Sequence, residues 1–184
     1  VKDSNGNLVY VHRVSRHNNA INSGNNDMKV SKGFIISPDA IDSDGASTTT
    51  TTMDWATANG YLATANQNKY DVASYAVPKG CAMYRGKYGK DAPGTWRVPT
   101  FREGSLIMIF YRELEETNVR TGFNKFALST NGTAYWLATE HSGSSTYAWY
   151  MKFYPDVTKV KYASSSGSKS TKYFLRCIRD IPSK

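Results

Sequence analysis

The chain has 184 residues, of which 13% are aromatic and 21% are charged, and its formal net charge at pH 7 is +8. This length is enough for one domain with a core plus an N-terminal extension, and the aromatic content argues against a disordered chain. No run approaches the roughly 18 apolar residues that a transmembrane helix needs, so we expect no membrane insertion. The abundant Ser, Thr, Asn and Gly are typical of the strands and loops of surface and secreted proteins.

The positive charge invites an anionic partner, but the basic residues are spread along the chain. Tyrosines stand among them, and aromatic rings beside cations can stack on bases or on sugars. We favour a solvated basic surface over a nucleic-acid interface, and we expect no nucleic-acid partner.

The N-terminal third predicts short strands joined by polar turns. An Asn-Gly dipeptide near the start is a strong hairpin signal, and residues 33–36 form a short apolar strand. The Ser/Thr run of residues 47–52 is expected to be a flexible connector. We therefore predict a β-rich extension at residues 1–46, packed on or linked to a main domain at residues 47–184.

Two helices are predicted next. Residues 54–65 place apolar side chains at helical spacing, although Gly60 weakens this helix. The clearest helix start is Thr100, because a Glu three residues later completes a capping box in which each side chain bonds the other residue's amide. Apolar spacing then predicts a packed helix over residues 100–116.

The remainder of the chain alternates apolar and polar residues as strands do. The predicted strands are residues 134–139, 147–154, 159–162 and 173–179, with a Ser/Gly loop at residues 163–170. In the second strand we assign Trp149, Met151 and Phe153 to the core face, and Tyr150, Lys152 and Tyr154 to an outer face. Helices followed by a small antiparallel sheet define an α+β fold.

Cys81 and Cys177 are the two cysteines of the chain. As a pair they are compatible with one disulfide, which would close a loop of about 100 residues and stabilise the fold by up to about 4–5 kcal/mol. Such a bridge would imply an oxidising compartment. The alternative is two independent buried thiols. Neither cysteine lies in a C-x-x-C motif, so redox catalysis and zinc binding have no basis in the sequence.

Motifs for catalysis and metal binding are weak. The tripeptide Glu-His-Ser at residues 140–142 places an acid, a base and a hydroxyl side by side, but consecutive strand residues point to different faces. Asp39, Asp42 and Asp44 could ligate calcium, although we favour a turn with solvated carboxylates. We predict no catalytic residue, no metal ligand and no cofactor.

Blocks of sequence in the second half of the chain resemble one bacterial family. In order they are Thr95-Trp96-Arg97-Val98-Pro99-Thr100-Phe101-Arg102-Glu103, Tyr135-Trp136-Leu137-Ala138-Thr139-Glu140, Ala148-Trp149-Tyr150-Met151-Lys152-Phe153 and Arg176-Cys177-Ile178-Arg179-Asp180. They are similar to the "WRLPT…E", "YWSSTE", "AWYVNF" and "RCVRD" blocks of a domain found at the C-terminus of the Lcl collagen-like adhesin and in fimbrial tip proteins of Bacteroidales.

The resemblance implies a C-type-lectin-like fold with a Cys81–Cys177 disulfide, displayed outside the cell on a fimbrium or cell surface. It implies a pilus-tip or surface adhesin that binds, without catalysis, a glycan or protein of a host or microbial surface, with neighbouring pilin subunits as further partners. The Glu-Pro-Asn, Gln-Pro-Asp and Trp-Asn-Asp motifs of calcium-dependent lectins are absent, so calcium-mediated sugar binding is not carried over. The alternatives are an enzyme of the formylglycine-generating type and a structural pilin subunit.

The expected ligand-binding surface is the outer face of the C-terminal sheet with its loops. Tyrosines with a few lysines give contact area at low entropy cost. The residues are His141, Ser144, Tyr147, Tyr150, Lys152, Tyr154, Asp156, Lys159 and Lys161. The alternative is that these side chains only solvate the sheet. Trp96, Pro99, Thr100 and Glu103 are expected to hold the fold and to touch no ligand.

Overall fold

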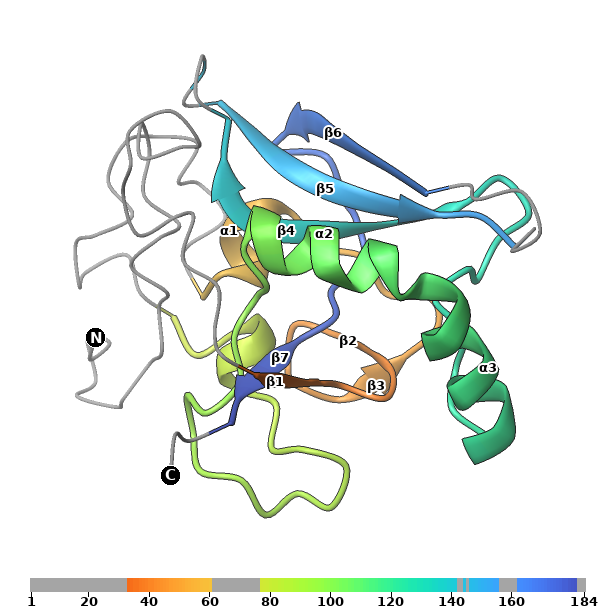
Figure 1. The fold of residues 1–184 in the computed structure, drawn as a ribbon. Helices are drawn as coiled ribbons and strands as arrows, with labels where there is room; N and C mark the ends of the chain where they lie inside the picture. The colour runs from red at the N-terminus through yellow and green to blue at the C-terminus, as the bar shows by residue number, and fades with distance from the viewer. Residues whose placement is uncertain (1–32, 61–76, 142–143, 145, 156–161, 182–184) are drawn as a thin grey trace.

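The chain is mixed helix and strand. The structure, a computed structural model, describes residues 33–60, 77–141, 144, 146–155 and 162–181 (Figure 1). The elements in chain order are β1 (Phe34–Ile36), β2 (Ala40–Ile41), β3 (Ser47–Thr48), α1 (Trp55–Ala58), the 3-10 helix η4 (Gly80–Ala82), α2 (Phe101–Ile109), α3 (Tyr111–Thr121), β4 (Thr133–Glu140), β5 (Tyr147–Phe153), β6 (Tyr162–Ser168) and β7 (Ile178–Asp180). The described strands form small antiparallel sheets, β4-β5-β6, β1-β7 and β2-β3, in agreement with the expected α+β class.

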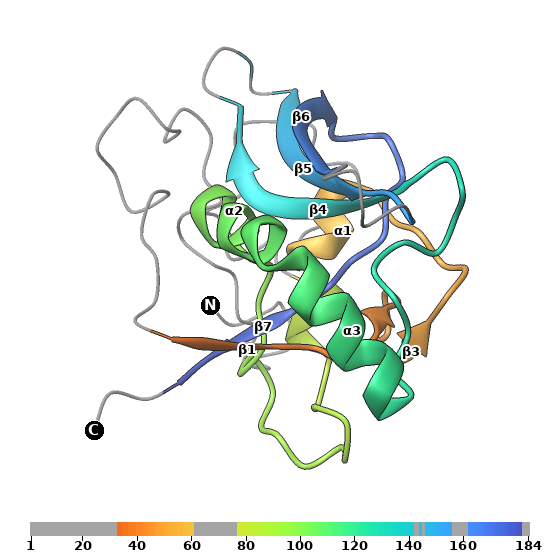
Figure 2. The same cartoon turned by 45° about the vertical axis from the view of Figure 1, so that its right-hand side comes forward.

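The β4-β5-β6 sheet is covered on both faces. Helix α2 lies across one face and α1 lies on the other (Figures 1 and 2). Alternate side chains of β4 enter two different core clusters, Trp136 on the α1 side and Tyr135 and Leu137 on the α2 side. Because β4 is buried on both faces, its sequence is an almost continuous apolar run.

The two ends of the described chain lie side by side. Strand β1 pairs antiparallel with β7, and the Ile181 amide donates to the Gly33 carbonyl at 3.0 Å. The domain boundary expected between residues 46 and 47 falls within the β2–β3 hairpin, whose Ala40 and Ile41 are buried. The described part of the expected extension therefore shares the core of the main domain.

Thr100 begins α2, as predicted. The Glu103 amide donates to Thr100 Oγ1 at 3.4 Å, and the Thr100 amide donates to the Glu103 carboxylate at 2.9 Å, so the capping box is complete. The single helix expected over residues 100–116 is divided, however, because the chain leaves helical geometry at Phe110 with φ −94° and ψ 18°. Helix α3 then continues to Thr121, beyond the predicted end.

Replacing Thr100 with Ala is expected to lower the free energy of unfolding by roughly 1 kcal/mol, because the amides at the start of α2 lose an acceptor. Urea unfolding measures the effect, and Ser105→Ala is the control, since it removes a hydroxyl from the same helix without touching the cap. Ligand binding should be unchanged. A loss of binding with unchanged stability would contradict the structural role given to Thr100.

The first helix is shorter than predicted. Helix α1 has a single turn, and Gly60, just after it, adopts a left-handed φ of 78° that ends the helix. The rest of the predicted residues 54–65 lies outside the described residues. The Ser/Thr run of residues 47–52 is also not purely a connector, since β3 occupies its start.

The Ser/Gly stretch expected to be a loop is a strand. Most of residues 163–170 belongs to β6, which pairs with β5 along its whole length. Pairing with a neighbouring strand outweighs the low strand propensity of Ser and Gly. Gly167 lies against two tyrosine rings, where an added Cβ would come within 3.1 Å of Tyr173 Oη. The last strand is correspondingly shorter than predicted, so Cys177 precedes β7.

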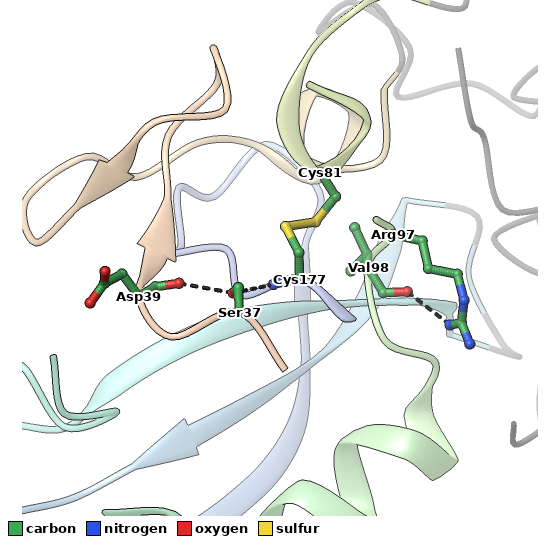
Figure 3. The surroundings of a disulfide bond; sticks show 6 residues. All are labelled: Ser37, Asp39, Cys81, Arg97, Val98 and Cys177. Atoms are coloured by element: carbon green, nitrogen blue, oxygen red, sulfur yellow. Dashed lines mark hydrogen bonds between the residues drawn. A yellow bond between two sulfur atoms is a disulfide. The ribbon is translucent and has the colours of Figure 1, made fainter. Parts of the chain in front are cut away.

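Cys81 and Cys177 form a disulfide with Cα atoms 5.6 Å apart, which confirms the expected pairing (Figure 3). The bridge ties η4 to the segment before β7, and both cysteines are buried. Ser37, just after β1, holds the backbone beside the bridge. Its hydroxyl accepts from the Cys177 amide at 3.0 Å and donates to the Asp39 carbonyl at 2.9 Å. A disulfide of this kind indicates an oxidising environment.

Candidate functional site

The expected contact surface is only partly described. The structure describes His141, Ser144, Tyr147, Tyr150, Lys152 and Tyr154, whereas Asp156, Lys159 and Lys161 lie outside the described residues. Among the six described residues, Tyr147 is the one exposed side chain, with 43% of its surface accessible, and the other five are half-buried.

The face of β5 that carries Tyr150 is not open. Trp149, Met151 and Phe153 pack on the α2 side, as predicted. Tyr150 points to the other side and packs on Tyr173, with ring centres 4.7 Å apart. Tyr150 is therefore half-buried, because Tyr173, in the chain after β6, packs against its ring.

The accessible parts of the expected surface lie at opposite ends of β5. Tyr147 begins the strand, near His141, whose ring centre is 5.5 Å from that of Trp149. Lys152 and Tyr154 lie at the other end, with the Lys152 ammonium 5.1 Å from the Tyr154 ring centre. A seven-residue strand spans roughly 20 Å, so one small ligand cannot touch both ends.

The residues expected to hold the fold are engaged within it. Glu103 is bonded to Arg97, whose guanidinium donates to both Glu103 carboxylate oxygens, at 2.7 and 2.6 Å. The same guanidinium donates to both Asp180 carboxylate oxygens, at 3.2 and 2.6 Å. Burial lowers the pKa of Arg97, but the hydrogen bonds to Glu103 and Asp180 outweigh it and the pKa is raised. The Trp96 indole donates to Asp91, and the Pro99 carbonyl accepts from β4.

Glu140 is also used internally. It forms a buried ion pair with Lys169, whose ammonium lies 4.5 Å from the Trp55 ring centre. Burial raises the pKa of Glu140 to about 7, and Lys169 opposes that rise. Burial likewise lowers the pKa of Lys169. This carboxylate therefore faces a lysine of the core, and Ser142 of the same tripeptide lies outside the described residues.

The acidic residues of the N-terminal third are occupied separately. Asp42 accepts the amides of Asp44 and Ala46, each at 2.9 Å, while Asp44 pairs with Lys79 and Asp39 accepts an amide from the α3–β4 connection. Within the described ranges, no cluster of three or more His, Cys, Asp or Glu side chains could hold a metal ion. In the structure these three carboxylates bond to separate partners.

A pocket not predicted from the sequence lies between β1, α3 and the loop of residues 85–96. We call it the basic pocket, and its volume is about 540 Å³. Apolar side chains line it from Phe34, Ile36, Leu114, Phe123 and Phe126. Its basic side chains are Arg85, Lys87, Lys90, Arg176 and Arg179. The sequence did not predict this cluster, because its basic residues are far apart along the chain and only the fold brings them together.

No protein-family model, curated protein or solved structure matches this chain. Among the helices that the structure describes, none is long and apolar enough to cross a membrane. The class of protein that fold and site define is thus a disulfide-bridged α+β domain with a basic, apolar-walled pocket.

Proposed function

We propose that this chain is a non-catalytic ligand-binding domain of C-type-lectin-like fold, displayed by a fimbrial tip or cell-surface adhesin. Its ligand is a glycan or protein on a host or microbial surface. The observation that carries the proposal is the pairing of β1 with β7, which brings both ends of the described chain together while the β4-β5-β6 sheet lies on the far side (Figures 1 and 2). A domain that is attached through the β1-β7 edge presents the side of the β4-β5-β6 sheet to a ligand.

The disulfide supports extracellular display. Disulfides persist in oxidising compartments. This one joins η4, which precedes α2 and α3, to the segment just before β7. Both cysteines of the chain lie in this bridge. An enzyme of the formylglycine-generating type needs a reactive thiol, so the bridge favours a binding domain over that alternative.

Tyr147 is the residue at which to test the adhesive surface, because it is the exposed tyrosine at the start of β5. Tyr147→Ala is expected to weaken binding to an array of glycans and extracellular-matrix proteins by about tenfold or more, as loss of an aromatic anchor does. Tyr88→Ala is the matched control, since Tyr88 is 79% exposed but lies in the loop of the basic pocket.

Binding of the wild type to some member of the array, lost in Tyr147→Ala and kept in Tyr88→Ala, would support the proposal. Equal binding by wild type and Tyr147→Ala would place the contact elsewhere. A wild-type protein that binds nothing on the array would argue against an adhesin.

A further inference from the structure

We propose that the basic pocket binds an amphiphilic organic anion, with the apolar body of the ligand against the aromatic wall and its carboxylate or phosphate head at Arg176. Among the described residues, the pocket shares none with the adhesive surface proposed above. This site is therefore a second one and does not depend on the first.

The walls of the pocket suit an apolar ligand body. Phe34 and Ile36 contribute from β1, Leu114 from α3, and Phe123 and Phe126 from the connection after α3. The volume of about 540 Å³ lies within the roughly 300–1,000 Å³ typical of small-molecule sites, which are mostly apolar with a few polar groups.

Arg176 is a buried cation at the pocket, and the carboxylates of Asp39 and Glu115 act on it electrostatically without contacting it as salt-bridge partners. It is 1% exposed, and its Nη2 donates to the Pro38 and Asn124 carbonyls at 2.6 and 2.7 Å. Its guanidinium lies 3.8 Å from the Phe126 ring centre. Among the described residues it forms no salt bridge within 4.0 Å. A buried charge without an ionic partner in contact is costly, and an anion in the pocket would supply that partner.

Two hydrogen-bond donors at the pocket are also unused. Arg176 Nε and Asn118 Nδ2 are buried and have no acceptor in the part of the chain that the structure describes, and both residues line the pocket. An unsatisfied buried donor destabilises the fold, so these groups favour a ligand that carries acceptor oxygens. A carboxylate or phosphate accepts from a guanidinium and an amide at once.

The other charges of the pocket agree with an anionic head. Asp91 is the one acidic residue among the described residues that line the pocket, and it is already neutralised, since one oxygen accepts from Arg179 at 2.7 Å and the other from Trp96 Nε1 at 2.7 Å. Lys87 and Lys90 are exposed at the rim, and the Lys87 ammonium lies 4.1 Å from the Phe123 ring centre. Cations at the mouth raise the local concentration of an anion.

Isothermal titration calorimetry of the disulfide-bonded chain tests the proposal with four probes: decanoate, decyl phosphate, decanol and inorganic phosphate. Decanoate, decyl phosphate or both are expected to bind, and the tighter of the two identifies the head group. Decanol and inorganic phosphate should bind at least about tenfold more weakly, because decanol lacks the anionic head and inorganic phosphate lacks the apolar body. Equal affinity for decanol and for both anions, or no binding of either anion, would overturn the proposal.

Variants locate the site without touching the buried Arg176. The double variant Lys87→Gln with Lys90→Gln is expected to lower the affinity for the anion several-fold. The matched control, Arg112→Gln with Arg120→Gln, removes the same charge from the exposed side of α3 and should leave the affinity unchanged. Thr117→Trp, on the pocket wall of α3, should abolish binding by filling the pocket. Anion binding that survives Thr117→Trp, or that is lost in Tyr147→Ala, would place the site elsewhere.

Discussion

Replacing Cys81 and Cys177 together with Ala is expected to lower the free energy of unfolding by about 4–5 kcal/mol. The bridge spans a sequence separation of 96 residues, and for a loop of about that size the chain-entropy model gives roughly 4.7 kcal/mol. Both cysteines are buried in the core cluster that includes Trp55 and Trp136, so the protein holds them at bonding distance. Urea unfolding without reductant, analysed for midpoint and slope, measures the loss.

The wild type in reductant is the control for this experiment, and it should unfold close to the double variant. An oxidised wild type with the same midpoint as the variant would contradict the prediction. Mass spectrometry under non-reducing conditions gives a second check, because detection of two free thiols would exclude the bridge itself.

Replacing Lys169 with Met is expected to destabilise the protein by about 3–5 kcal/mol at pH 8. This change leaves the Glu140 carboxylate buried without the ammonium that donates to it, and removing one partner of a buried ion pair costs about that much. Thermal or urea unfolding measures the difference. A loss below about 1 kcal/mol would mean that the pair is solvated like a surface salt bridge.

The effect of Lys169→Met should depend on pH in a defined direction. Burial already raises the pKa of Glu140 from 4.5 to about 7, and loss of the lysine raises it further. An acid whose pKa is higher in the folded state than in the unfolded state binds more protons when folded. Stability therefore falls as the pH rises from about 4.5 through the folded pKa, and the variant should be less impaired at pH 5 than at pH 8.

The double variant Glu140→Gln with Lys169→Met controls for the buried charge. With no carboxylate left to ionise, it should recover most of the stability lost at pH 8 and lose the added pH dependence. A double variant as unstable as Lys169→Met at pH 8 would show that packing of the Lys169 side chain, and not the ion pair, sets the cost.

Local rules accounted for the elements with strong local signals. The spacing of Thr100 and Glu103 predicted the start of α2, and the alternation of residues 147–154 predicted β5 and its α2-facing side chains. These predictions needed only the chain neighbours, because a capping box and a strand period are properties of a few consecutive residues. The pairing of the two cysteines, by contrast, came from the family resemblance, since their spacing left separate thiols open.

Other features had no local signal. Nothing near Phe110, neither Pro nor Gly, marks the break between α2 and α3. The Ser/Gly composition of β6 predicted a loop, and only its pairing with β5 makes it a strand. A lysine in a Ser/Gly-rich stretch is expected to be exposed, yet Lys169 is buried against Trp55 and paired with Glu140.

By itself, the sequence determined the α+β class, the capped start of α2 and the central strands β4 and β5, because each depends on spacing along a short segment. Only the tertiary structure decided that Tyr150 packs against Tyr173 and that a basic pocket exists. The pocket joins residues from β1, from the loop before α2, from α3 and from the segment around Arg176. Residues so far apart in the chain meet through packing alone, and no local pattern encodes that meeting.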